Sequence, residues 1–284
     1  MPAPIEDAGG ARPLAGKRVA VLEHRELDRL GGMLEAQGAE TVRCALVAIV
    51  DALDPAPVEA WLRRFVESPP DDLVLMTGEG LRRLLGFAGR AGLEAAFRDA
   101  VGAVRTIPRG PKPARALREI GLAPTLRAEQ PTTEGVVAAL SAASLAARRV
   151  AVQLYPNAAA TLAAFVSQAG GVPDTVLPYA YVPAVDDGAI LALIDEMAAG
   201  RVDVTAFTSA PQVVRLFAAA EAAGLEAKLR IALGRTAIAA VGPVVAAELT
   251  QRGLAVAIMP RDNFFMKPLV TAIVTALGRE AGAP

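Results

Sequence analysis

The chain contains two copies of one unit, and this internal duplication limits its possible folds more than any other feature. Three pairs of segments share a separation of 131 positions: Arg18-Val19-Ala20-Val21 with Arg149-Val150-Ala151-Val152, Gln37-Gly38 with Gln168-Ala169, and Thr77 with Thr208. The segment GPKPARALREIGL from Gly110 matches GPVVAAELTQRGL from Gly242 with a shift of 132. Packing requires apolar strands and a capping glycine in any two similar units, but it does not require the Gly-Pro and Thr matches. We therefore infer a duplication.

Short apolar runs alternate with longer amphipathic stretches throughout both copies. The predicted strands are Lys17–Leu22, Val42–Val50, Leu73–Met76, Ala103–Ile107, Arg149–Val152, Val202–Phe207, Ala237–Val241 and Ala255–Met259. The helix after the first strand is expected to end at Gly38. Strands that alternate with helices favour parallel sheets covered on both faces. Because ligands bind beyond the carboxyl ends of such strands, we expect the functional site in a cleft between the two copies.

Composition excludes several classes of function. Hydrophobic residues make up 53% of the 284 residues and the net charge is −1, so no overall field attracts nucleic acid or an anionic membrane. Cys44 and His24 are the single cysteine and histidine, too few for a disulfide or a Cys/His zinc site. No run of about 20 apolar residues is present, and the first sixteen residues lack the apolar core of a signal peptide. We expect a cytoplasmic protein without a metal, nucleic-acid or membrane partner.

Polar or small residues follow several predicted strands. These turns are Thr77-Gly78-Glu79-Gly80, Arg109-Gly110-Pro111-Lys112, Tyr155-Pro156-Asn157, Thr208-Ser209-Ala210 and Val241-Gly242-Pro243. The start of a helix presents unpaired backbone N–H groups and a positive dipole, which suit carboxylates or phosphates. The Thr, Ser and Asn side chains could instead serve only as helix N-caps. The sequence leaves both interpretations open.

No nucleotide-binding or hydrolase motif accompanies these turns. The dinucleotide motif G-x-G-x-x-G fails because its third glycine would fall at Arg83, and no Gly-Lys-Ser/Thr is present. His24 is the single histidine and no G-x-S-x-G occurs, so a Ser-His-Asp triad is poorly supported. Arg25, next to His24, is placed for an anion clamp, although a solvated arginine fits there equally well. Cys44, in an apolar run, is expected to be buried and inert.

Two of the three tyrosines, Tyr179 and Tyr181, lie close together in the sequence. In the repeat they fall where the second strand of the second copy is expected, opposite the apolar Leu46–Ile49 of the first copy. A phenol there can donate a proton or a hydrogen bond, with an ordinary pKa of about 10. A packing role explains either tyrosine alone equally well.

The order and spacing of these segments resemble the uroporphyrinogen-III synthase family from about Gly16 to Leu277. The segments that carry the resemblance are Phe207-Thr208-Ser209-Ala210-Pro211, Val241-Gly242-Pro243 with the helix that ends at Gly253-Leu254, Pro178-Tyr179-Ala180-Tyr181-Val182-Pro183, Met76-Thr77-Gly78-Glu79-Gly80 and Arg109-Gly110-Pro111-Lys112. The last two are similar to the form that these turns take in a bacterial branch of the family.

The resemblance implies two flavodoxin-like α/β domains with parallel sheets, joined by two crossing strands. Residues 1–45 with 183–284 would form one domain and residues 46–182 the other, with the active-site cleft between them. It also implies a cofactor-free lyase of tetrapyrrole (haem) biosynthesis. That enzyme cyclises hydroxymethylbilane to uroporphyrinogen III, with loss of water and inversion of ring D. We expect a monomer whose partner is this small-molecule substrate.

The same resemblance implies roles for individual residues. Tyr179 would assist departure of the substrate hydroxyl as an acid or hydrogen-bond donor. The residues expected to bind substrate are Arg25, Thr77, Gly78, Arg109, Gly110, Lys112, Tyr155, Asn157, Thr208, Ser209, Ala210, Gly242 and Pro243. Val244, Val245 and Pro113 stand where relatives often carry Thr. These departures leave a second function open, a non-catalytic tetrapyrrole-binding or regulatory homologue. A sugar- or phosphate-binding module of unrelated descent is the third.

Overall fold

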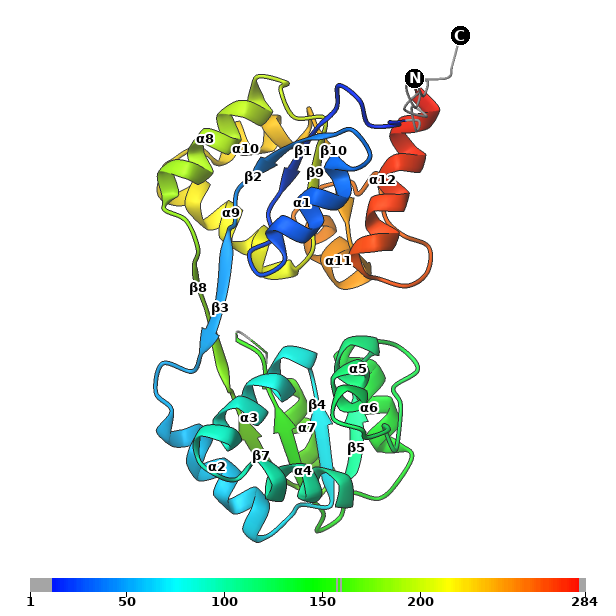
Figure 1. The fold of residues 1–284 in the computed structure, drawn as a ribbon. Helices are drawn as coiled ribbons and strands as arrows, with labels where there is room; N and C mark the ends of the chain where they lie inside the picture. The colour runs from blue at the N-terminus through cyan, green and yellow to red at the C-terminus, as the bar shows by residue number, and fades with distance from the viewer. Residues whose placement is uncertain (1–11, 157, 159, 281–284) are drawn as a thin grey trace, which may run out of the picture. The chain divides into compact units, whose positions relative to one another are not determined.

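The structure, a computed structural model, describes residues 12–156, 158 and 160–280. The chain divides into two compact units, of which unit 1 comprises Met1–Ala48 and Val182–Pro284 and unit 2 comprises Ile49–Tyr181. The strands β3 (Val47–Asp51) and β8 (Tyr179–Pro183) pair with each other and carry the chain from one unit to the other (Figure 1). The N–H of Ala184 donates to the carbonyl of Leu46 at one end of this pair.

Unit 1 is built around a parallel sheet. Its described elements are β1 (Arg18–Val21), α1 (Leu27–Glu35), β2 (Glu40–Arg43), α8 (Asp187–Ala198), β9 (Val204–Phe207), α9 (Ala210–Ala222), α10 (Glu226–Leu233), β10 (Ala237–Ala240), α11 (Pro243–Gln251) and α12 (Met266–Glu280). The strand order is β10-β9-β1-β2, and all the pairings are parallel. In Figure 1, α1 and α12 lie on one side of this sheet and α8 and α10 on the other.

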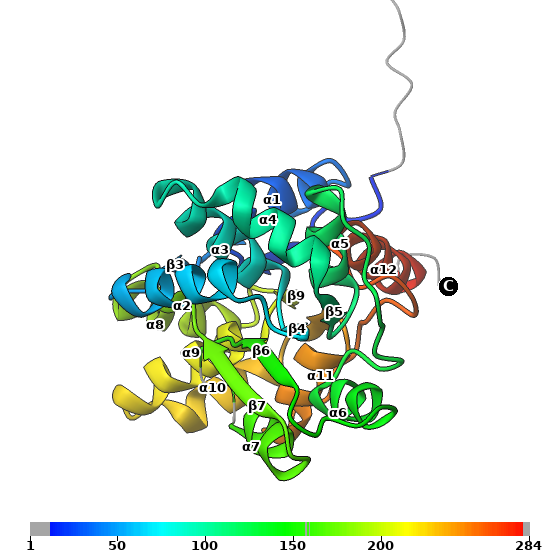
Figure 2. The same cartoon turned by 90° about the horizontal axis from the view of Figure 1, so that it is seen from below.

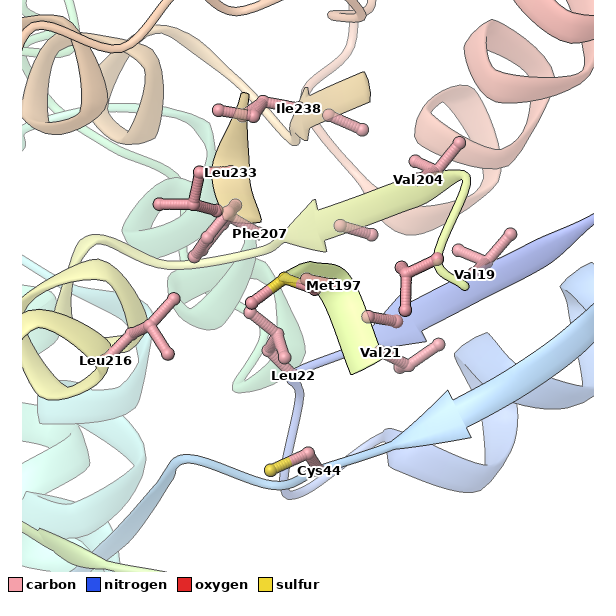
Figure 3. Packing of buried hydrophobic residues seen from close by; sticks show 14 of the residues in the cluster. Val19, Val21, Leu22, Cys44, Met197, Val204, Phe207, Leu216, Leu233 and Ile238 are labelled. Atoms are coloured by element: carbon pink, nitrogen blue, oxygen red, sulfur yellow. The ribbon is translucent and has the colours of Figure 1, made fainter. Parts of the chain in front are cut away.

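The core of unit 1 is formed by apolar side chains from its strands and helices. Figure 3 shows Val19 and Val21 of β1 and Val204 and Phe207 of β9 with residues of the surrounding helices, among them Met197. All of these side chains are fully buried. Continuous burial along a strand requires a sheet that is covered on both faces, which explains the uninterrupted apolar runs in the sequence.

Unit 2 repeats this architecture. Its described elements are α2 (Ala56–Glu67), β4 (Asp72–Leu75), α3 (Gly78–Arg90), α4 (Glu94–Ala103), β5 (Arg105–Pro108), α5 (Pro111–Glu119), α6 (Thr133–Ser141), β6 (Arg149–Gln153), α7 (Thr161–Gln168) and β7 (Val172–Val176). The strands lie in the order β5-β4-β6-β7 and all the pairings are parallel. Figure 2 shows these four strands from below.

Unit 2 has two hydrophobic cores, one on each face of its sheet. Residues 73 to 76, which are β4 and the residue after it, face these two cores in alternation. Leu73 and Leu75 pack against α2, α3 and α4, together with Trp61 of α2. Val74 and Met76 pack against α6 and α7 on the other face. Successive strand residues point to opposite faces, so coverage of both faces explains the continuous apolar run Leu73–Met76. The prediction of an α/β fold with parallel sheets is confirmed.

Two of the predicted strands differ in the structure. The run Val42–Val50 is divided between β2 and β3, because the chain leaves the unit 1 sheet near Cys44 and pairs with β8 beyond it. The run Ala255–Met259 forms no strand, and only an isolated bridge joins Ile258 to Ala239. Apolar content shows that a segment is buried but does not show which partner it pairs with.

The repeat also has a different register from the one predicted for Thr77 and Thr208. Val19 pairs with Val204, whereas Val150, its counterpart 131 positions later, pairs with Asp72. The separation in the second half of each sequence copy is therefore 132. At that separation Thr77 corresponds to Ser209, and these are the N-cap residues of α3 and α9. The proposed equivalence of Thr77 with Thr208 is wrong by one position.

Between residues 12 and 280, none of the described helices is both long enough and apolar enough to span a membrane.

Candidate functional site

Thr77 caps helix α3 at the carboxyl end of β4. Its hydroxyl oxygen accepts a hydrogen bond from the backbone N–H of Gly80, over 3.0 Å. Its own backbone N–H donates to the side-chain oxygen of Gln153, also over 3.0 Å. Thr77 therefore has the N-cap role that the sequence left open, and its N–H group is already bonded within the protein.

Gln153, the last residue of β6, fills the space above Gly80. The Gln153 side chain is fully buried, and a Cβ atom added to Gly80 would overlap its carboxamide group. The amide nitrogen of Gln153 donates to the carbonyl of Leu154. Glycine at position 80 is therefore required by the close approach of this carboxamide.

In unit 1 a carboxamide also binds the N–H of the helix N-cap residue, but it comes from a helix rather than from a strand. Gln212 of α9 accepts hydrogen bonds from the N–H groups of Thr208, over 2.8 Å, and Ser209, over 3.2 Å. By position in the helix Gln212 corresponds to Gly80, and the unit 1 residue that corresponds to Gln153 is Leu22. Each unit thus binds the N–H of its helix cap with one glutamine.

Glu23 is a further member of the unit 1 strand ends that the sequence interpretation missed. Its carboxylate accepts a hydrogen bond from the Thr208 hydroxyl and another from the backbone N–H of Arg25, the latter over 3.3 Å. Thr208 is buried, whereas the Arg25 side chain is exposed. Glu23 lies two residues after β1 and directly follows the apolar run that ends at Leu22, which is the signal that could have identified it.

Tyr179 lies at the start of β8, beside the cap of α3. Its hydroxyl oxygen is 3.1 Å from that of Thr77, and only 1% of the residue is exposed. The N–H of Ala52 donates to the carbonyl of the preceding Pro178, which holds β8 against the chain that follows β3. Burial raises the pKa of Tyr179 far above its ordinary value, so this phenol is neutral at physiological pH.

The other tyrosines and an arginine complete this group, which we call the tyrosine cluster (Tyr155, Tyr179, Tyr181 and Arg109). The rings of Tyr179 and Tyr181 are 5.7 Å apart at an interplanar angle of 70°. The guanidinium of Arg109 lies 5.0 Å from the centre of the Tyr155 ring. Within the described residues Arg109 forms no ion pair, so its charge remains available for an anion.

Ion pairs on α3 fix the end of β3 beside this cluster. Arg83 donates to Asp51 over 2.8 Å, to Glu79 over 2.7 Å and to the carbonyl of Ile49 over 2.9 Å. Arg90, two turns further along α3, also donates to Asp51, over 2.6 Å. Because β3 pairs with β8, these contacts also support the strand that carries Tyr179 and Tyr181.

A small cavity of about 140 Å³ adjoins Tyr155 in unit 2. Its lining residues are Met76, Thr133, Glu134, Leu154, Tyr155, Ala158, Thr161 and Leu162. Helix α7 begins at Thr161, so Tyr155 does not lie directly at the start of a helix as the sequence suggested. Asn157, the other residue predicted in this turn, lies outside the described residues.

The two Gly-Pro turns start helices α5 and α11 with the same local packing. A Cβ atom on Gly110 would lie 2.8 Å from Cβ of Pro131, and one on Gly242 would lie 2.8 Å from Cβ of Phe264. Each glycine thus allows a later segment of its own unit to pack on the turn. Pro111 and Pro243 occupy the first helical position, which suits proline because no N–H is needed there.

The remaining predicted residues differ in exposure. Gly78 and Gly242 are buried, Ala210 is the partly exposed first residue of α9, and Lys112 and Pro243 are exposed. Of the positions where relatives often carry Thr, Pro113 and Val245 are buried and Val244 is 45% exposed. A hydroxyl at Val245 would therefore lie in the core of unit 1, and one at Pro113 would be buried in the first turn of α5.

Comparisons with known proteins identify the family. Residues 28–271 match the family described as uroporphyrinogen-III synthase HemD. The uncharacterized protein YjjA of Bacillus subtilis is 33% identical over 242 residues, which cover 85% of this chain and 89% of YjjA. The crystal structure of a mutant uroporphyrinogen III synthase from the extremely thermophilic bacterium Thermus thermophilus aligns with a TM-score of 0.74 and 26% identity, covering 93% of this chain and 99% of that one. The uroporphyrinogen-III synthetase of Helicobacter pylori, at 11% identity and a TM-score of 0.51, shares the fold over 91% of this chain and 98% of its own. The chain therefore belongs to the uroporphyrinogen-III synthase family and has its two-domain α/β fold.

Proposed function

We propose that the protein is a uroporphyrinogen-III synthase, which converts hydroxymethylbilane to uroporphyrinogen III with loss of water and inversion of ring D. The tyrosine cluster carries this proposal, because it joins neutral phenols to an arginine without an ion pair among the described residues. The match of residues 28–271 to the family supports the substrate class. We expect a monomeric, cytoplasmic enzyme with no nucleic-acid or membrane partner.

The reaction requires a proton donor at the leaving hydroxyl group and control of the conformation of the rest of the substrate. A neutral phenol protonates the leaving hydroxyl group, which departs as water while the pyrrole supplies the electron pair that forms an azafulvene. The far pyrrole then attacks at its substituted carbon and gives a spiro intermediate, which opens and recloses with that ring inverted. The proton lost on rearomatisation restores the phenol. No redox step occurs, so the proposal includes no cofactor.

The protein must also bind the substrate carboxylates and exclude simple head-to-tail closure, which is a task of positioning. The Arg109 guanidinium is held by the Tyr155 ring and can bind a carboxylate with two parallel hydrogen bonds. The exposed Lys112 lies in the first turn of α5, three residues further along. The N–H groups of Thr77 and Ser209 bind glutamine side chains, so these two backbone donors are not part of the proposal.

An isomer-resolved assay tests the proposed function. Freshly prepared hydroxymethylbilane is incubated with the protein, and the oxidised products are separated into the type I and type III uroporphyrins. Enzyme-dependent type III product supports the proposal, whereas spontaneous type I product alone, from folded protein, contradicts it.

The exposed apolar side chain of Val244 favours a second candidate, a homologue that binds a tetrapyrrole without cyclising it. Val244 is 45% exposed in the first turn of α11, where relatives often carry a hydroxyl group. The two candidates predict different results when the same preparation is tested for both properties. Binding of uroporphyrin III without formation of the type III isomer would favour the second candidate.

A further inference from the structure

The two tyrosines of β8 differ in exposure and in the contacts of their hydroxyl groups. Tyr179 is 1% exposed and its hydroxyl lies against Thr77, whereas Tyr181 is partly exposed. Their rings meet edge to face, 5.7 Å apart. The more exposed ring of Tyr181 is therefore the better placed of the two to meet a ligand.

The hydrogen bonds around Thr77 set the direction of proton donation. A threonine hydroxyl has one proton to donate, and that of Thr77 already accepts from Gly80. Its possible acceptors are Tyr179, over 3.1 Å, and Gln153, over 3.4 Å. We assign the proton to the shorter contact, and the lowering of the pKa of Tyr179 by the Thr77 hydroxyl agrees with donation to this phenol. The proton of Tyr179 is then directed toward Tyr181.

The groups around Tyr181 also support donation of a hydrogen bond from Tyr179 to Tyr181. Burial raises the pKa of both phenols, and the negative charges that Tyr155 and Glu79 can carry raise the pKa of Tyr181 further. The Tyr179 hydroxyl and the charge of Arg109 act in the opposite direction on Tyr181, because they stabilise its phenolate. For Tyr179, contact with the Tyr181 hydroxyl raises the pKa.

We infer that Tyr181 presents the phenol that contacts the substrate, and that Tyr179 is a positioning residue that donates a hydrogen bond to it. The inference rests on the proposed function and deepens it. Tyr181 gives its proton to the leaving hydroxyl of hydroxymethylbilane, the C–O bond breaks, and water departs. The resulting phenolate is held by Tyr179 and Arg109 until it recovers the proton released on rearomatisation. Catalysis then requires Tyr181 directly and Tyr179 through it.

Substitution by phenylalanine separates these roles. Tyr181→Phe removes the acid and is expected to lower kcat by about 10²–10⁴-fold with little change in KM. Tyr179→Phe removes one hydrogen bond to that acid and is expected to lower kcat by about tenfold. Ser167→Ala removes an exposed hydroxyl near the end of α7 and serves as the control, with kcat nearly unchanged. A larger loss of kcat in Tyr179→Phe than in Tyr181→Phe would overturn the inference.

Fluorine labels test the inference without depending on activity. The whole protein is prepared with 3-fluorotyrosine, a more acidic phenol, at position 179, 181 or 155 in turn, and each signal is followed by ¹⁹F NMR against pH. We expect position 181 to ionise at a lower pH than position 179, and Tyr179→Phe to raise the pKa at position 181. Only the label at 181 should move the alkaline limb of the kcat profile to lower pH. Ionisation of position 179 first would contradict the inference.

The stable octacarboxylate uroporphyrin III separates failure of the inference from failure of the proposed function. Its addition should shift the ¹⁹F signal at position 181 more than that at 179. If the protein forms no type III product but this shift occurs, the proposed activity fails and the ligand contact of Tyr181 stands. If type III product forms while the signal at 179 shifts and that at 181 does not, the activity stands and the inference fails.

Discussion

The hydroxyl oxygens of Thr77 and Tyr179 lie 3.1 Å apart, so one side chain joins the start of a helix to the phenol of a neighbouring strand. The Thr77 oxygen also accepts the N–H of Gly80, which places the hydroxyl at a fixed point relative to α3. The capping interaction and the orientation of Tyr179 are therefore coupled. A change at Thr77 should alter stability and catalysis together.

Substitution of Thr77 tests this coupling. Thr77→Val keeps the shape but removes the hydroxyl, and the loss of the cap should lower the free energy of unfolding by about 1 kcal/mol. It should also lower kcat, because Tyr179 loses its hydrogen-bond donor. Thr77→Ser keeps the hydroxyl and should retain most of both properties. Urea unfolding and steady-state kinetics measure the two effects. An unchanged kcat in Thr77→Val would show that the hydroxyl contact has no role in turnover.

The buried glutamine above Gly80 predicts a strong effect of adding a side chain there. Gly80→Ala should destabilise the protein by about 1–3 kcal/mol, because the new methyl group overlaps the Gln153 carboxamide. Gly32→Ala is the matched control, since Gly32 lies inside α1 with no atom near its Cβ position. It should stabilise the protein by roughly 0.5–1 kcal/mol.

The arrangement in unit 1 suggests a second substitution that would compensate for a side chain at position 80. The pair Gly80→Gln and Gln153→Leu places the carboxamide on the helix, as Gln212 and Leu22 do in unit 1. We expect this double variant to be more stable in urea than Gly80→Gln alone. Equal stability of the two variants would mean that the glutamines of the two units are not interchangeable.

Cys44 predicts a loss of stability at alkaline pH. The thiol is 5% exposed, and burial raises its pKa from 9.0 to about 11. The unfolded chain therefore releases this proton at a lower pH than the folded protein, and the stabilising contribution is lost as pH rises from 9 toward 11. Between pH 8 and pH 10 the effect should be about 1.3 kcal/mol. Urea unfolding at both pH values should show a smaller decrease for Cys44→Ala. An equal decrease in both proteins would refute the assignment.

Arg109 predicts a change in substrate affinity in addition to its effect on the Tyr181 phenolate. Arg109→Met removes the guanidinium and should raise KM by about tenfold or more, the equivalent of one charge-assisted hydrogen bond. Arg109→Lys should recover only part of the affinity, because an ammonium group lacks the planar, two-point geometry. Arg63→Met removes an exposed charge from α2 and serves as the control for net charge. A KM that is equal in Arg109→Met and the control would remove Arg109 from the substrate site.

The sequence predicted the parts of the fold that depend on burial and left out those that depend on pairing. Uninterrupted apolar runs identified β1, β4, β6, β9 and β10. Hydrophobicity is the same on both sides of Cys44, so the pattern predicts one strand from Val42 to Val50. Only the backbone pairing shows that the chain changes partners there.

The site shows the same limit. Tyr179 and Tyr181 are close in the sequence, so their proximity could be foreseen, but Tyr155 and Arg109 come from other strand ends and join them only through the fold. The role of Gln153 could not be predicted from the repeat. The glutamine with the same role in unit 1, Gln212, lies on a helix rather than at the end of a strand. The match of Thr77 to Thr208 rests on residue type and on the separation of 131 found elsewhere in the repeat, whereas the strand register gives a separation of 132.

The most direct test of the account is the proportion of type III isomer formed from hydroxymethylbilane as a function of protein concentration. Spontaneous closure gives the type I isomer, so inversion of ring D reports catalysis by the protein alone. We predict that the type III fraction rises with the concentration of the wild-type protein and falls back toward the spontaneous value in Tyr181→Phe at equal concentration. A product that remains type I at every concentration of folded wild-type protein would contradict the account.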